Sequence, residues 1–195
     1  IREVMLAALY VLFGAAFTIA SCIAAGRLVL RWLRLPLDRA EAWLFSFLLG
    51  SVVVSNAVFL LCAVRLVHKG VLLAAGAGTI WVAARTSLPP HRDRKGAILP
   101  YYLAAAAMAY FVLYFFNAMA PEISPDGSTY HLGLVGRYIR GRGFHRITTS
   151  MYANLSQGVE MLFVPAFAFG RHSAAAMVHL AFLLALPLAI ALYAR

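Results

Sequence analysis

The stretch VMLAALYVLFGAAFTIASCIAAG, residues 4–26, contains no charged side chain. A helix of about 20 apolar residues crosses the hydrocarbon core of a bilayer, so this stretch predicts a membrane-spanning helix. Four further apolar runs follow it along the chain, at residues 42–64, 67–84, 98–120 and 173–194. Each is predicted to span the membrane, because a helix satisfies its own backbone hydrogen bonds in lipid.

The composition of the whole chain agrees with this interpretation. Of its 195 residues, 63% are hydrophobic and only 12% are charged, whereas soluble domains carry about 25% charged residues. We therefore expect an all-α, polytopic helical membrane protein with about five transmembrane helices. Its expected regions are a four-helix transmembrane region over 1–120, a long outer loop over 121–172, and a fifth transmembrane helix over 173–195.

The net charge of +10 does not indicate nucleic-acid binding. The basic residues lie between apolar runs, where they set topology and meet anionic lipid headgroups. The two cysteines, Cys22 and Cys62, lie inside apolar runs, where a thiol behaves as a small hydrophobic group. The chain has no C-x-x-C or H-E-x-x-H spacing, so no cofactor is expected and a divalent metal is not indicated.

Basic residues in the short loops predict the orientation. The loops after the first and third runs are rich in arginine and lysine, which marks the cytoplasmic face. The N-terminus and the 121–172 loop are then predicted to lie on the outer side of the membrane. The long loop is nevertheless rich in arginine itself, which opposes that rule. Either the orientation is reversed or these arginines have a separate role; they are Arg137, Arg140, Arg142, Arg146 and Arg171.

Two short helices are predicted within the long loop. The first follows a possible cap at Asp126 or Ser128 and has apolar residues at helical spacing from Tyr130, which suits a helix lying in the membrane interface. Gly141 and Gly143 are expected to end it. The second helix is expected to run from a cap at Ser156 to a stop at Gly170.

The same loop holds the candidate chemistry. Asp126 is either a helix cap or a partly desolvated proton acceptor, and the residues alone favour neither. His131 either faces lipid headgroups or hydrogen-bonds Asp126 or a bound phosphate. Arg137 and Arg140 either anchor headgroups or bind a lipid phosphate through paired hydrogen bonds. Glu160 lies in an apolar helix, so it is expected to pair with an arginine or a sugar hydroxyl.

The segments DGSTYHLGLVGRYIRGRGF (126–144) and NLSQGVEMLF (154–163) resemble the first large outer loop of bacterial GT-C membrane glycosyltransferases. The resemblance covers residues 115–195 and is to the protein-mannosyltransferase and aminoarabinose-transferase group. The positions that match this pattern are Asp126, Tyr130, His131, Tyr138, Gly143, Phe144, Gln157, Glu160 and Leu162. Where many relatives have an acidic residue directly after the loop aspartate, this chain has Gly127, which weakens any metal role carried over from them.

This resemblance implies an inverting enzyme, or the N-terminal portion of a longer one, that takes a sugar from a polyprenyl-phosphate donor. Asp126 would deprotonate the acceptor hydroxyl. The residues expected to bind substrate are Tyr130, His131, Arg137, Arg140, Gln157 and Glu160. The alternative is a non-catalytic membrane module that binds an anionic polyprenyl lipid or a partner membrane protein. A transporter fragment is less favoured, because no predicted spanning run has an acidic residue or arginine at its centre.

Overall fold

The computed structural model describes residues 2–86, 101–155 and 157–194. Within these ranges every regular element is a helix, which confirms the predicted all-α class. The elements are α1 (Arg2–Leu33), α2 (Arg39–Ala63), α3 (Lys69–Ala84), α4 (Tyr101–Met119), η1 (Gly127–His131), α5 (Leu132–Arg140), η2 (Met151–Asn154) and α6 (Glu160–Tyr193).

Three helices, α1, α2 and α6, are long and apolar enough to cross a membrane. The third and fourth predicted spans correspond to shorter helices. The 16 residues of α3 extend over about 24 Å at 1.5 Å per residue, which is less than the hydrocarbon thickness of about 30 Å. Many large apolar side chains on these helices are exposed, Trp32, Trp43 and Phe116 among them. Lipid rather than water is the solvent that such a surface requires.

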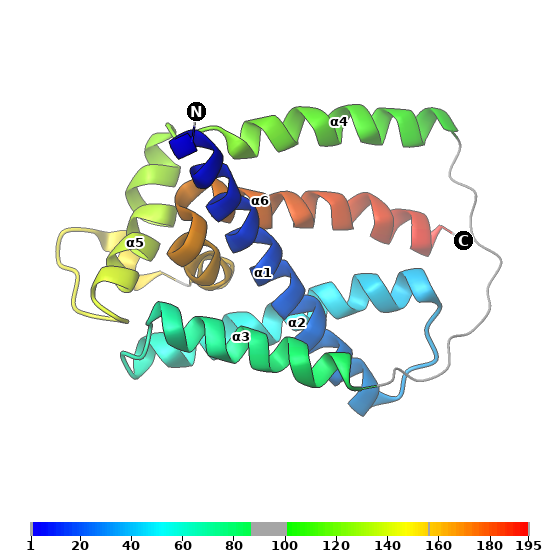
Figure 1. The fold of residues 1–195 in the computed structure, drawn as a ribbon, viewed down its shortest axis with the longest axis horizontal. Helices are drawn as coiled ribbons and strands as arrows, with labels where there is room; N and C mark the ends of the chain where they lie inside the picture. Colours follow the sequence, from blue (N-terminus) through cyan, green and yellow to red (C-terminus); the bar gives the residue numbers. More distant parts are fainter. Residues whose placement is uncertain (1, 87–100, 156, 195) are drawn as a thin grey trace.

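The helix ends gather at two sides of the bundle (Figure 1). One side holds the N-terminus of α1, the turn between α2 and α3, and the segment from the end of α4 to the start of α6. The opposite side holds the turn between α1 and α2 and the C-terminus. The N-terminus and the long loop therefore lie on the same side of the bundle, as the basic residues in the short loops predicted.

Small residues bring α1 against its two neighbours. A Cβ atom added to Gly50 of α2 would lie 1.6 Å from the backbone oxygen of Cys22, and one added to Gly26 would lie 1.8 Å from that of Ser46. Cys22 and Gly26 are four residues apart, as are Ser46 and Gly50, which is the small-xxx-small spacing of closely packed membrane helices. A second close contact joins Gly14 of α1 to Ala166 and Gly170 of α6.

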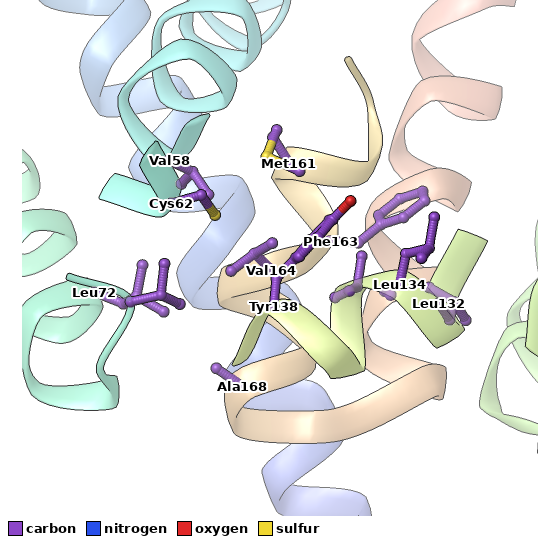
Figure 2. Packing of buried hydrophobic residues seen from close by; sticks show 13 residues of the cluster. Val58, Cys62, Leu72, Leu132, Leu134, Tyr138, Met161, Phe163, Val164 and Ala168 are labelled. Carbon is purple, nitrogen blue, oxygen red and sulfur yellow. The ribbon is translucent and has the colours of Figure 1, made fainter. Parts of the chain in front are cut away.

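The long loop packs onto this bundle as part of one apolar core (Figure 2). Leu134 and Val135 of α5 are fully buried and Tyr138 is 2% exposed. They pack with residues from α2, α3 and the first part of α6; these include Val58, Cys62, Leu72, Met161, Phe163, Val164 and Ala168. The apolar face of α5, which the sequence pattern directed toward the membrane interface, is therefore covered by protein instead of lipid.

The helix that follows the loop is broken in the middle. Arg171 has non-helical φ and ψ of 56° and −147°, so α6 consists of a short first part and a longer second part. This break confirms the stop predicted at Gly170. The first part begins at Glu160, and the cap predicted at Ser156 lies outside the described residues. Cys22 and Cys62 are buried free thiols, as predicted.

Candidate functional site

A cavity of about 480 Å³ lies where the long loop meets the second part of α6. Three carboxylates line it, those of Glu122, Asp126 and Glu160, and no lysine or arginine does so among the described residues. The remaining lining residues are Ser124, Gly127, His131, Leu132, Val159, Phe163, Ala175, Ala176 and His179. The cavity therefore combines an acidic polar side with an apolar side.

Asp126 lines this cavity without acting as a helix cap. Its side chain makes no capping hydrogen bond to the π-helical turn η1 that follows it. The capping oxygen is that of Ser124, which accepts a hydrogen bond of 3.0 Å from the backbone N–H of Gly127. The prediction that Asp126 or Ser128 caps this helix is therefore wrong: Ser124 reaches the free N–H first, and the hydroxyl of Ser128 donates to the carbonyl of Ser124 instead. The carboxylate of Asp126 is exposed and free for chemistry.

Tyr130 lies next to Asp126 and reports on its charge. The pKa of Tyr130 is raised above its ordinary value, first by desolvation and then by the negative charge of Asp126 and a side-chain hydrogen bond to it. The ring of Tyr130 stacks on that of Tyr152, with centroids 4.1 Å apart. It also packs against the ring of His131 at 4.5 Å. These contacts hold the phenol beside the aspartate.

His131 and Glu160 form the polar link between the loop and α6. Nδ1 of His131 lies 2.8 Å from Oε1 of Glu160, across 29 positions of sequence. A carboxylate only accepts, so Nδ1 carries the proton when Glu160 is ionised. The ring nitrogen Nε2 of His131 is then the one that Glu160 does not engage. The predicted arginine partner of Glu160 is replaced by this histidine, because Glu160 faces the cavity and the arginines do not line it.

Gln157 lies at the edge of this group. Its Nε2 donates a 3.2 Å hydrogen bond to the backbone carbonyl of Tyr152, the residue that stacks on Tyr130. Its side-chain oxygen is buried and has no hydrogen-bond partner among the described residues. The structure thus brings together five of the seven predicted site residues: Asp126, Tyr130, His131, Gln157 and Glu160.

Arg137 and Arg140 are not part of this group. Neither lines the cavity. Arg137 donates a 3.0 Å hydrogen bond to the hydroxyl of Thr149, and Arg140 is exposed on the last turn of α5. Substrate binding by these two arginines stays a prediction that the contacts do not support.

A second hollow of about 340 Å³ continues from the cavity along α4 and α6. The two share Glu122, Ala176 and His179. Beyond these shared residues the second hollow is lined mainly by apolar or aromatic side chains, with one amide; the lining residues are Tyr114, Asn117, Ala118, Leu180 and Leu183. The cavity at the helix ends and this second hollow, the groove, thus share a wall.

Two ionisable lining residues, Glu122 and His179, were not among the predicted site residues. Glu122 hydrogen-bonds Ser124, and this bond lowers the pKa of the Glu122 carboxyl. His179 had been expected only to pack between helices, and its ring does lie 6.2 Å from that of Phe163. The signal for His179 was its position inside an apolar run, since a polar ring there is costly unless it meets a cavity or a partner.

Among the described residues, no group of three or more His, Cys, Asp or Glu side chains is placed to hold a metal ion. Comparison with protein-family models, with curated proteins and with solved structures finds no match to this chain.

Proposed function

We propose that the chain is a membrane glycosyltransferase of the GT-C type, or a portion of one, that uses a polyprenyl-phosphate-linked sugar as donor. One observation carries this proposal. A cavity holding an uncapped aspartate and a histidine–glutamate pair shares a wall with a groove whose apolar side chains come from α4 and α6. A donor with a polar sugar phosphate on a long apolar chain needs such a pair of adjoining compartments.

In the proposed reaction Asp126 accepts the proton of an acceptor hydroxyl. The acceptor oxygen then forms a bond to the anomeric carbon of the sugar while the bond from that carbon to the phosphate oxygen breaks. The electron pair leaves with the polyprenyl phosphate, and the configuration at the anomeric carbon is inverted. A single displacement of this kind needs one base, and of the three carboxylates that line the cavity Asp126 is the one whose described contacts are limited to Tyr130.

The leaving phosphate gains negative charge, and a hydrogen-bond donor beside it lowers the barrier. His131 is the candidate, because Glu160 fixes its Nδ1 and leaves Nε2 available to the cavity. Protonated His131 would donate from Nε2 to a phosphate oxygen. Glu160 then acts as a positioning residue that orients the ring.

The location follows from the same proposal. The membrane-length apolar helices place the chain in a membrane. Short-loop charges favour an orientation with the cavity on the outer side of the membrane, and the sequence resemblance implies that this is the periplasmic side of a bacterial inner membrane.

A photoreactive donor tests the proposal. A polyprenyl-phosphate sugar with a diazirine in its lipid chain is expected to label residues 114–122 and 176–183 on illumination. Leu183→Trp fills the groove and should abolish this labelling, whereas Leu186→Trp, on the exposed surface of the same helix, should preserve it. Labelling that is spread evenly over α1, α2 and α6, or that ignores excess unlabelled donor, would overturn the proposed site.

A further inference from the structure

The arginines that do not line the cavity are gathered elsewhere, against the turn between α2 and α3. The backbone N–H of Val67 donates to the carbonyl of Arg142 at 2.9 Å, and that of Phe144 donates to the carbonyl of Cys62 at 2.8 Å. Nε of Arg65 donates to the carbonyl of Phe144 at 3.2 Å. Main-chain contacts thus hold two basic segments side by side although 75 or more positions separate them.

Both segments are free of acidic residues. The sequence has no aspartate or glutamate between positions 42 and 92, or between 127 and 159. The surface that the two segments form together is therefore purely basic, and we call it the basic surface. Its exposed members are Arg65, His68, Lys69, Arg140, Arg142, His145 and Arg146. Among the described residues none of its arginines or its lysine forms an ion pair.

The basic surface lies at the end of α2. α2 is an apolar helix of membrane-spanning length that ends at Ala63, and Arg65 follows two residues later. Val64 and Leu66 on either side of Arg65 are exposed apolar side chains. Arginine between exposed apolar neighbours is typical of the boundary between hydrocarbon and water, where the guanidinium reaches the phosphates.

We infer that the basic surface binds the phosphates of anionic phospholipid headgroups in the surrounding membrane, and so holds the long loop at the bilayer surface. This inference does not rest on the proposed function, because none of these residues lines the cavity or the groove. It gives a role to the arginines on the side of the bundle that holds the long loop, where positive charge opposes the orientation rule. Each cation near an anionic membrane surface strengthens association by roughly fivefold.

The test measures the apparent Kd of phosphatidylglycerol for the full chain by native mass spectrometry in neutral detergent, with phosphatidylcholine as the reference lipid. The variant Arg140→Gln/Arg142→Gln/Arg146→Gln removes three charges but leaves the main-chain contacts at residues 142–144 intact. It is expected to weaken phosphatidylglycerol binding at least fivefold with no change for phosphatidylcholine. The matched variant Arg140→Lys/Arg142→Lys/Arg146→Lys keeps the charge and is expected to bind as the parent does.

Each outcome bears on the inference. Unchanged phosphatidylglycerol binding in a folded Gln variant would overturn it. Equal losses in the Gln and Lys variants would also overturn it, because they would indicate a single phosphate gripped by paired guanidinium hydrogen bonds. If the Gln variant fails to fold, the Lys variant still tests the inference through the salt dependence of its phosphatidylglycerol binding. Binding that resists 0.5 M salt would contradict a headgroup interaction, which screening weakens.

Discussion

Replacing Leu134 with alanine tests whether the long loop is held by the protein core. Leu134 is fully buried between α5 and α6, and a leucine-to-alanine change at such a site costs about 2–5 kcal/mol. Alanine is the best helix former, so the loss comes from packing and not from helix propensity. At 1.4 kcal/mol per tenfold, the backbone amides of α5 should exchange with solvent about 25-fold faster or more. Hydrogen exchange in nanodiscs measures this change.

The matched control is Ile123→Ala, which removes a similar apolar side chain from the same loop at a position that is 91% exposed. It is expected to leave α5 exchange within about threefold of the parent, since surface changes cost little. If Leu134→Ala has the same small effect, α5 is not held by the core, and its apolar face would be free to contact lipid.

Three further predictions address packing, electrostatics and orientation. Gly50→Leu should lower the Tm in detergent, because its Cβ would lie 1.6 Å from a backbone oxygen of α1 and overpacking costs about 1–3 kcal/mol. The control Gly78→Leu, at a position where nothing lies within 4 Å, should leave the Tm unchanged. Asp126→Asn should lower the pKa of Tyr130 toward its ordinary value, because it removes a negative charge and weakens a hydrogen bond that both oppose the phenolate. Ring ¹³C NMR titration measures this pKa, and an unchanged value would show that Asp126 does not act on Tyr130. A cysteine at Ser150, in a chain without other cysteines, should react with an impermeant thiol reagent in intact cells; reaction only after lysis would reverse the orientation.

Apolar periodicity and run length predicted the fold because they depend on local sequence. The runs at 4–26 and 42–64 correspond to α1 and α2, and the glycine stop at 170 corresponds to the break in α6. The pattern did not predict which surface covers the apolar face of α5. Lipid and protein are equally apolar partners for such a face, and only the fold brings the first part of α6 against it.

Part of the candidate site could also be predicted from the sequence. Asp126, His131 and Glu160 stood out because charged and polar groups are costly near apolar surface. The pairing of His131 with Glu160 was not predictable, because the two are 29 positions apart and Glu160 had several arginines as candidate partners. The cap at Ser124 was missed because aspartate and serine cap equally well, and only backbone geometry decides between them.

In the proposed reaction, Asp126 removes the proton of the acceptor in the cavity. Asp126→Asn keeps the size of the side chain but cannot accept a proton. With a polyprenyl-phosphate sugar, donor binding should stay within about threefold of the parent, whereas transfer should fall by about 100-fold or more, the contribution of a positioned base. Glu3→Gln, which removes a carboxylate that does not line the cavity, should retain both. Near-normal transfer by Asp126→Asn, in a chain whose parent is active, would show that Asp126 is not the base.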